Sequence, residues 1–249
     1  ILPTASINLR NFLDYVALGT IADMAPLDGV NHILCKIGLE VMFENVMAGT
    51  QPGIAQLLRL AGWKSDGGKI DATDVGFKIG PRLNAAGRLG NALATEELLS
   101  TFDTQKANNL AEFLHMENSQ RQSLEKDMTS QAMEKISLMT VLPAAFVLHE
   151  PDWHTGVVGL VASRVLEKYY RPAIVMGSLD GKLKGSGRST HAFNLFSCLN
   201  EVREEFNSFG GHFHAIGCSL DSSKLEWLTN YLHESAQRKW NDLDTKHPL

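Results

Sequence analysis

The sequence predicts an α/β protein built as two lobes that a long helix connects. Three observations lead to this prediction. Residues 8–62 repeat apolar side chains at helical spacing between short breaks. From Thr104 to about Leu138 the chain contains no Gly and no Pro. After Pro143, short apolar stretches alternate with helical patterns, which is typical of α/β domains.

The first lobe is expected to be mostly helical. The segments Asn11–Ala22 and Asn31–Met47 are each apolar along one helical face. One Pro and two Gly within Gly49–Gly53 break the chain before a short helix at Ile54–Ala61.

The next segment is expected to hold a turn at Lys64–Lys69 and then a helix that Asp71 caps. This helix should end near Gly80–Pro81, because Pro disfavours helical geometry in the residue before it. The stretch PRLNAAGRLG at 81–90 is therefore expected to be a loop, and another helix should begin around Ala92.

The stretch without Gly or Pro predicts a single helix of more than thirty residues, roughly 50 Å long at 1.5 Å per residue. Apolar side chains recur along it near helical spacing, although polar Asn118 and Arg121 interrupt the stripe. A helix of this length without internal caps suggests a stalk between two lobes.

The second lobe is expected to alternate strands and helices. Strands are predicted at Ala144–His149, at Ala173–Met176, in a segment that ends at GSGRS, and near Ala215–Leu220. Helices are predicted at Gly156–Tyr170, Ala192–Glu204 and Ser223–Trp240.

Composition limits the possible functions. The net charge of −5 argues against nonspecific binding of nucleic acid over the whole surface, so any such site must be a local basic groove. No apolar run approaches the roughly 18 residues that span a bilayer. Cys35, Cys198 and Cys218 are odd in number and far apart, which predicts reduced thiols in a cytoplasmic protein. The chain starts without Met, inside what reads as a folded segment, so we expect a piece of a longer protein.

Asp23 is the first candidate for a chemical role. It follows the apolar helix in VALGTIADMAPLD at 16–28, where an Asp often caps the next turn. The alternative is a carboxylate ligand for Mg²⁺ or Mn²⁺. The residues alone leave both open. Asp28, which precedes Gly29 and a helix, is expected to be a simple cap.

Arg82, Asn84 and Arg88 stand among small residues in the expected loop at 79–90. Two arginines in such a loop should not be core residues. They could be solvated, or could pair with Glu96 and Glu97. The small residues would equally let a nucleic-acid strand approach, and Arg both stacks on bases and binds phosphate.

Three glycine-rich clusters in the second lobe suit a backbone that approaches phosphate groups closely. They are WHTGVVG at 153–159, GSGRST at 185–190 and GGHFHAIG at 210–217. Glycine permits tight turns whose N–H groups bind anions, and Arg adds a planar fork that fits phosphate oxygens. His154 either caps the helix that follows or joins its N-terminus in binding an anion.

The second and third clusters are expected to bind phosphate rather than to catalyse. The nucleophile motif G-x-S-x-G is absent from GSGRS, so Ser186, Gly187, Arg188 and Ser189 fit a phosphate cradle better. His212 and His214 have no nearby carboxylate or thiol that would complete a metal site. A Gly210–Gly211 turn that presents His212 to a phosphate is the preferred interpretation.

Taken in order, these segments resemble the RecJ family of single-strand-specific DNA exonucleases, in the DHH phosphoesterase superfamily. The resemblance depends on VALGTIAD, IGPRLNAAGRL, NSQRQ at 118–122, WHTGVVGLVASR, GSGRS and GGHFHAIG, which together cover nearly the whole chain. Ile216 stands where the family usually has a second Ala, a mild departure at an apolar position.

The resemblance implies an architecture. Residues 1–103 would be the C-terminal part of the DHH domain, 104–140 the connecting helix, and 141–249 the DHHA1 domain with a mixed sheet. In the family, the D-x-D and Asp-His-His motifs that supply most metal ligands lie N-terminal to VALGTIAD, and the residues before VALGTIAD in this sequence contain neither. The chain by itself should therefore show little or no nuclease activity.

The resemblance also implies a function, namely stepwise hydrolysis of single-stranded DNA from the 5′ end, with two Mn²⁺ or Mg²⁺ ions, in recombination and repair. Asp23 would be one metal ligand, and Arg82 and Arg88 would line the strand channel. Ser186, Arg188, Ser189 and His212 would hold phosphates. A single-strand-binding protein and a helicase are possible partners. The protein is expected to be a monomer that does not bind membranes. Two alternatives stay open: a phosphoesterase for short oligonucleotides, and a non-catalytic single-strand-binding module.

Overall fold

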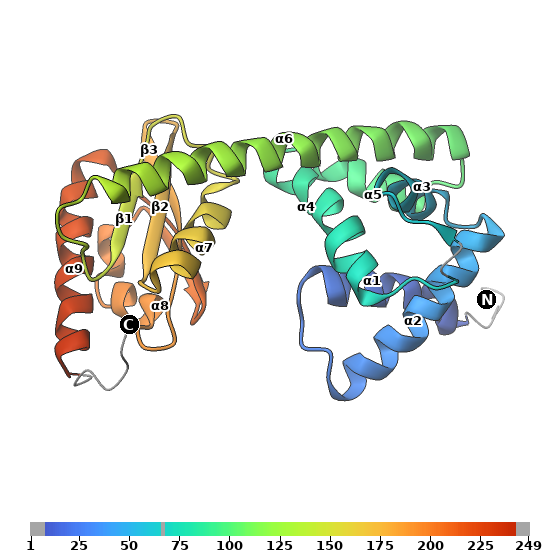
Figure 1. The fold of residues 1–249 in the computed structure, drawn as a ribbon, viewed down its shortest axis with the longest axis horizontal. Coiled ribbons are helices and arrows are strands. Elements are labelled where there is room, and N and C mark those ends of the chain that lie inside the picture. The colour runs from blue at the N-terminus through green and yellow to red at the C-terminus, as the bar shows by residue number, and fades with distance from the viewer. Residues whose placement is uncertain (1–7, 66–67, 243–249) are drawn as a thin grey trace, which may run out of the picture. The chain divides into compact units, whose positions relative to one another are not determined.

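The computed structural model describes residues 8–65 and 68–242 (Figure 1). The chain divides into two compact units, Ile1–Arg121 (unit 1) and Gln122–Leu249 (unit 2). Unit 1 is helical and unit 2 combines a sheet with helices, as the sequence predicts. None of the described helices has both the length and the apolar character needed to cross a membrane.

Unit 1 is a bundle of helices around one apolar core. Its elements are a 3₁₀ turn at Leu9–Phe12, α1 Leu13–Ala22, α2 Gly29–Ala48, α3 Pro52–Leu60, a π-helical segment Asp74–Ile79, α4 Gly80–Leu89, α5 Ala92–Ser100 and the first part of α6 Thr104–Ser137. Helices α1 and α2 cross closely at Gly38, where a Cβ would lie 2.1 Å from the Leu13 carbonyl oxygen.

A buried polar network fixes the start of α1 within this core. Asp14 is fully buried, and its Oδ2 accepts hydrogen bonds from Asn45 Nδ2 at 2.8 Å and Gln51 Nε2 at 3.2 Å. The neighbouring Tyr15 hydroxyl donates to the Leu99 carbonyl oxygen at 2.7 Å. Since each buried polar atom named here has a partner, the network fixes how α1 meets the segments around it.

The structure corrects the expected loop at 81–90, which is the helix α4. Asp71 does cap the helical stretch that precedes α4. Its Oδ1 accepts a hydrogen bond from the Asp74 N–H at 2.9 Å, and Asp74 Oδ2 accepts one from the Asp71 N–H at 3.1 Å. That helix continues through the π-helical segment into α4. Pro81 lies in the first turn of α4, where a missing N–H is tolerated. The stop comes later, at Gly90, with φ of 100°.

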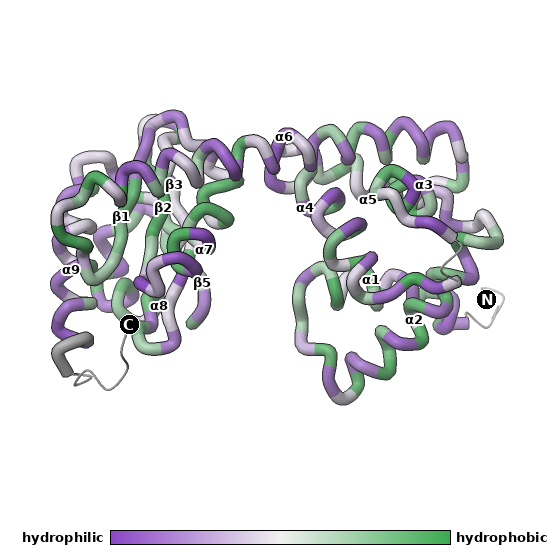
Figure 2. The backbone as a smooth tube through the Cα atoms, in the orientation of Figure 1, coloured by the Kyte–Doolittle hydropathy of each residue, from purple (hydrophilic) through white to green (hydrophobic). Residues whose placement is uncertain are grey.

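The predicted long helix is confirmed as α6, with 34 residues. Its first half contributes Ala107, Ala111 and Leu114 to the core of unit 1. Its second half contributes Met128, Ala132 and Ile136 to a core of unit 2. In Figure 2 hydrophobic and hydrophilic residues alternate along α6, whereas β1 and β2 are largely hydrophobic.

Unit 2 is built on a mixed sheet with strand order β1-β2-β3-β5-β4. Its elements are β1 Phe146–His149, α7 Val158–Tyr169, β2 Ala173–Leu179, β3 Lys182–Arg188, α8 Leu195–Asn200, a 3₁₀ turn Arg203–Glu205, β4 Ser208–His212, β5 Ala215–Asp221, a 3₁₀ turn Ser222–Lys224 and α9 Leu225–Asp242. Strand β1 pairs with β2 in parallel, and the other pairs are antiparallel.

Helices cover the two faces of this sheet unequally. The second half of α6 and helix α7 pack on one face, against Ala173 and Val175 of β2. Helices α8 and α9 pack on the other face, against Ile174 of β2 and Ile216 of β5.

All three cysteines are unpaired, and burial raises the pKa of the Cys218 thiol to about 12.

Strand β4 was not expected from the sequence. The glycines Gly210 and Gly211, interpreted as a turn, lie within β4, and the turn follows at Phe213–His214. Four of the five β4 residues are exposed, so the strand carries no alternation of apolar and polar residues that would reveal it.

Candidate nucleic-acid interface

The α7 side of strands β3, β5 and β4 carries a regular array of polar and small residues. Residues paired directly across neighbouring strands point to the same face of a sheet. The pairing gives three rows on this face: Arg188–Ala215–His212, Ser186–Gly217–Gly210 and Lys184–Ser219–Ser208. We call these nine residues the open face, because each of them is exposed or half-buried.

The middle row forms an open floor of glycine. A Cβ added to Gly210 or to Gly217 would meet no atom of the described chain within 4 Å. Helix α7 packs over β2 and β3, and within the described residues no helix packs over this side of β5 and β4. A ligand could therefore reach the strand backbone itself at this row.

Arg188 is held in place at the edge of this floor. Its Nη1 donates to Ser186 Oγ at 3.0 Å and to the Gly187 carbonyl oxygen at 2.9 Å, and its Nε donates to Ser163 Oγ at 3.0 Å. A Cβ at Gly159 of α7 would lie 3.1 Å from Ser186 Oγ and 3.2 Å from Arg188 Nη2. Glycine at position 159 therefore gives the guanidinium its room, and Ser163 sets its orientation.

The structure divides the predicted cradle GSGRS into two sets. Ser186 and Arg188 belong to the open face, whereas Gly187 and Ser189 turn toward the core, as the two-residue period of a strand requires. A Cβ at Gly187 would lie 2.5 Å from the Leu195 side chain. Ser189 is 7% exposed, and its Oγ accepts from the Leu195 N–H at 2.9 Å. Packing and capping thus explain these two residues.

The third cluster divides in the same way. Gly210 and His212 belong to the open face, and Gly211 points to the opposite side with φ of 145°. A Cβ at Gly211 would lie 2.3 Å from the Ala215 carbonyl oxygen, so the hairpin itself requires this glycine. Gly217 was not among the predicted site residues, although the repeated glycines of GGHFHAIG contain it.

His154 lies in the turn before α7, whose N-terminal cap is Val157. Its Nδ1 accepts a hydrogen bond from the Gly156 N–H at 3.1 Å, and its carbonyl oxygen accepts from the Val157 N–H at 2.9 Å. The adjoining Trp153 is buried and donates from Nε1 to Gln131 Oε1 at 2.7 Å. His154 therefore shapes the turn before α7, and its binding of an anion stays a prediction.

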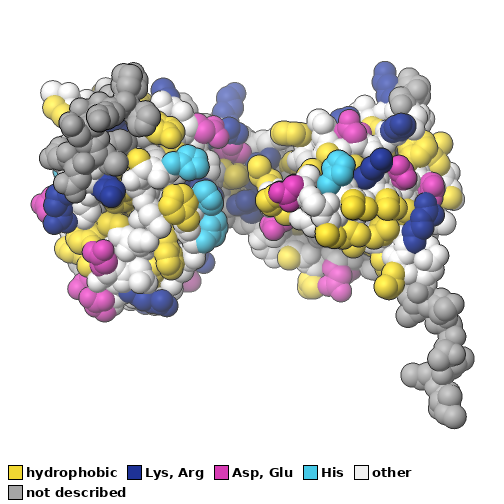
Figure 3. All heavy atoms as spheres, turned by 90° about the horizontal axis from the view of Figure 1, so that it is seen from below, with side chains coloured by type: hydrophobic (Ala, Val, Ile, Leu, Met, Phe, Trp, Pro, Cys, Tyr) yellow, Lys and Arg dark blue, Asp and Glu magenta, His cyan; other side chains and the backbone are white. Residues whose placement is uncertain are grey.

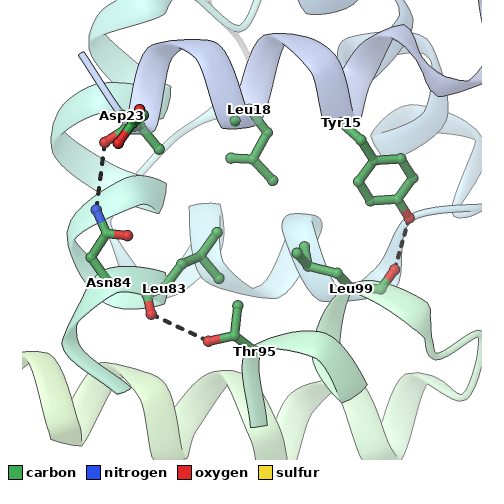
Figure 4. Close-up of a pocket in the computed structure, with 9 residues that line it drawn as sticks. Tyr15, Leu18, Asp23, Leu83, Asn84, Thr95 and Leu99 are labelled. Atoms are coloured by element: carbon green, nitrogen blue, oxygen red, sulfur yellow. Dashed lines mark hydrogen bonds between the residues drawn. The ribbon is translucent and has the colours of Figure 1, made fainter. Parts of the chain in front are cut away.

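In unit 1, Asp23 borders a pocket of about 400 Å³ (Figure 4). The pocket is lined by Tyr15, Leu18, Gly19, Ala22, Asp23, Leu83, Asn84, Thr95 and Leu99. Asp23 is the exposed C-terminal cap of α1, and its carboxylate has no hydrogen-bond donor among the described residues. A negative charge at a helix C-terminus opposes the helix dipole. Local stability therefore does not account for this carboxylate.

The structure brings Asn84 next to the end of α1 and turns Arg82 elsewhere. Asn84 Nδ2 approaches the Ala22 carbonyl oxygen at 3.5 Å. Asn84 and Arg88, four residues apart, share an exposed face of α4. Arg82 instead donates from Nε to His115 Nδ1 at 3.1 Å and from Nη1 to the Lys78 carbonyl oxygen at 2.5 Å, and burial lowers its pKa.

The described residues do not by themselves form a metal centre. No group of three or more His, Cys, Asp or Glu within the described ranges is arranged to hold an ion. Asp23 offers one carboxylate, whereas Mg²⁺ and Mn²⁺ need further oxygen ligands.

Comparison with curated proteins identifies relatives along nearly the whole chain. Residues 139–238 match the family model of the DHHA1 domain. The Bacillus subtilis single-stranded-DNA-specific exonuclease RecJ is 37% identical over 234 residues, which are 93% of this chain and 29% of that protein. The Escherichia coli protein of the same name is 39% identical over 229 residues, 88% of this chain and 39% of its own length. The chain thus spans well under half of these relatives.

Solved structures show the same fold at similar coverage. The crystal structure of RecJ in complex with Mn²⁺ from Thermus thermophilus matches with a TM-score of 0.80 at 33% identity, over 92% of this chain and 33% of that one. A crystal structure of exonuclease RecJ bound to manganese matches with a TM-score of 0.76 at 33% identity, over 92% of this chain and 55% of that one. The chain therefore belongs to the RecJ family, and its residues 139–238 match that family's DHHA1 domain.

Proposed function

We propose that this chain is the strand-holding part of a metal-dependent exonuclease that degrades single-stranded DNA from the 5′ end in recombination and repair. The open face is the observation that supports this proposal. It places basic side chains in the outer rows, with Arg188 and His212 at one end and Lys184 at the other. Ser186 and the glycine floor lie between these rows, Ser219 and Ser208 share the row of Lys184, and none of the nine residues is acidic.

Each property of the open face suits a phosphate backbone. Arg188 and Lys184 attract the strand electrostatically, and charged donors make stronger hydrogen bonds to phosphate oxygens than neutral ones. The glycine floor lets sugar and phosphate groups approach the sheet. Nothing in the array reads the edges of bases in a fixed pattern, so the contacts would be independent of sequence.

Divalent Mn²⁺ or Mg²⁺ would supply the hydrolytic chemistry, in a two-ion arrangement to which Asp23 gives one carboxylate. The remaining ligands would come from residues outside those described here. A single-strand-binding protein, a helicase, a monomeric state and a cytoplasmic location stay predictions. The absence of a metal-binding cluster among the described residues favours a second possibility for the chain alone, a binding module without activity.

The salt dependence of single-strand binding by the purified chain tests the phosphate contacts. The substitution Arg188→Ala should weaken binding and flatten the slope of log affinity against log salt by about 0.7, the change expected when one phosphate contact on a single strand is lost. Arg238→Ala is the matched control, because α9 packs on the opposite face of the sheet. An unchanged slope in Arg188→Ala would overturn the proposal.

Incubation with Mn²⁺ and a labelled single strand tests the catalytic part. We expect the chain alone to bind the strand without releasing nucleotides, since the described residues lack a complete set of ligands. Nucleotide release that Asp23→Ala abolishes would show instead that this chain contains a sufficient centre.

A further inference from the structure

The two hairpins of the unit 2 sheet differ in their turn residues. The β2–β3 turn consists of Asp180 and Gly181, with φ of 52° and 74°. Positive φ at both positions is the geometry that two-residue hairpins favour, and Asp-Gly suits it. The β4–β5 turn consists of Phe213 and His214, and neither residue has positive φ. Turn geometry therefore does not explain the choice of an aromatic pair at this second hairpin.

Four rings gather at this turn. The centroid of Phe213 lies 4.9 Å from that of His214 and 6.5 Å from that of His191, and the His212 and His214 centroids are 6.0 Å apart. We call these residues the ring cluster. All four are exposed, and Phe213 keeps 37% of its surface accessible. Figure 3 shows histidine side chains gathered on one face of unit 2.

The ring cluster continues the open face at its turn end. His212 belongs to both, in the row Arg188–Ala215–His212, which is the last row before the turn. The Ser189 N–H donates to the His214 carbonyl oxygen at 3.2 Å, so the segment after Arg188 is tied to the turn. A phosphate held by Arg188 and His212 would thus place the attached nucleotide beside Phe213.

We propose that the ring cluster, and Phe213 in particular, is a stacking platform for a base of the bound single strand. This inference rests on the proposed function, because it assumes that the phosphate of that nucleotide lies at the Arg188–His212 row. Aromatic side chains stack on any base, and such stacking is independent of sequence. The ring cluster contains no acidic side chain that would repel the neighbouring phosphate.

The alternative is that the rings merely stabilise the hairpin, and the chain offers an internal comparison. If hairpin stability were the reason, the Asp-Gly pair of the β2–β3 turn would serve better at the second hairpin. The double substitution Phe213→Asn with His214→Gly removes both rings and lets the turn adopt the positive φ angles that two-residue hairpins favour. It should therefore keep or raise the melting temperature while it removes stacking.

The experiment compares two probes of equal length and charge, a single strand with bases and an abasic strand. Wild-type chain should bind the base-containing strand more tightly. Phe213→Ala and the double variant should each weaken that binding on the order of tenfold and leave abasic binding unchanged. Arg188→Ala should weaken binding of both probes.

The results distinguish base stacking on Phe213 from phosphate binding by the open face. Equal binding of the base-containing strand by Phe213→Ala and wild type would overturn the platform, while a loss in Arg188→Ala would keep the phosphate contacts. A lower melting temperature in the double variant would assign the rings to hairpin stability and would also overturn it. Failure of the wild-type chain to bind either probe would refute the proposed function itself.

Discussion

The substitution Gly217→Val tests the open face most directly, because it changes the surface without changing the fold. Gly217 sits in the centre of the array, paired with Ser186 on one side and Gly210 on the other. An added Cβ would meet nothing within 4 Å in the described chain, and the φ of Gly217 is not positive. A β-branched residue thus fits the strand without strain.

The expected effects on stability and on binding have opposite signs. Replacing a strand glycine with valine should leave the free energy of unfolding unchanged or raise it by roughly 0.5–1 kcal/mol. The isopropyl group would cover the floor and keep a phosphate from approaching Arg188, the charged donor at its edge. Losing one charge-assisted hydrogen bond costs about 1.5–3 kcal/mol, which is roughly a 10- to 150-fold loss of affinity.

Thermal unfolding and fluorescence anisotropy with a labelled single strand measure the two effects on one preparation. Gly177→Ala is the contrasting control, because its Cβ would lie 1.9 Å from the Trp153 carbonyl oxygen and should destabilise unit 2 by overpacking. A stably folded Gly217→Val that binds the strand with wild-type affinity would refute the open face as the binding surface. A clearly lower melting temperature would refute the geometry assigned to Gly217.

Gly159, Met24 and Cys218 each allow a test of local geometry. Gly159→Ala should weaken strand binding, because its Cβ would crowd Ser186 and Arg188 and displace the guanidinium; equal affinity in the binding assay would contradict this. Met24 is 89% exposed and has φ of 57°, a left-handed conformation that strains residues other than glycine. Met24→Gly should therefore stabilise the chain by about 1 kcal/mol in denaturant unfolding, and a loss of stability would contradict this strain. Burial raises the pKa of Cys218 to about 12, so its thiol should resist alkylation until the protein unfolds. Since the folded state favours the neutral thiol, this group's contribution to stability is full below about pH 9 and is lost as pH rises toward about 12; a stability curve flat across that range would contradict it.

The elements that the sequence predicts well are those with a strong period. The long helix α6 is found within a residue of its expected end, because no Gly or Pro interrupts it and its apolar residues serve two cores. Strands β2 and β5 are buried on at least one face, and their apolar residues reveal them. Burial on a regular face leaves a pattern that can be counted along the chain.

The errors fall where local signals conflict with longer-range structure. Pro81 predicts a helix end, but the π-helical segment before it leads into α4 and the proline occupies a first turn. Strand β4 contains SFGGH, whose glycines predict a turn, and pairing with β5 makes it a strand. Its partner β5 follows after only the two turn residues Phe213 and His214, but glycines are depleted in strands, so the residues of β4 do not reveal the pairing.

The same limit applies to the site. The motif GSGRS identifies Ser186, Gly187, Arg188 and Ser189 together, and only the register separates the residues of the open face from those that pack inward. Gly159 and Ser163 lie within WHTGVVGLVASR, but the motif does not mark them as site residues, because their role is to position Arg188 across the sheet–helix interface. Their spacing of four residues puts both on one face of α7.

An acidic chain that binds a polyanion must separate its charges in space. With a net charge of −5, the whole surface repels DNA at long range, so attraction must come from a patch without carboxylates. The open face meets this condition, and the nearest acid in its strands, Asp221, lies one row beyond it and pairs with Lys182 across the sheet. The patch offers Lys184, Arg188 and His212, so few phosphates can be neutralised at once. We therefore expect a shallow salt slope, no steeper than about −2 for three single-strand contacts, and a steeper measured slope would require basic residues beyond this face.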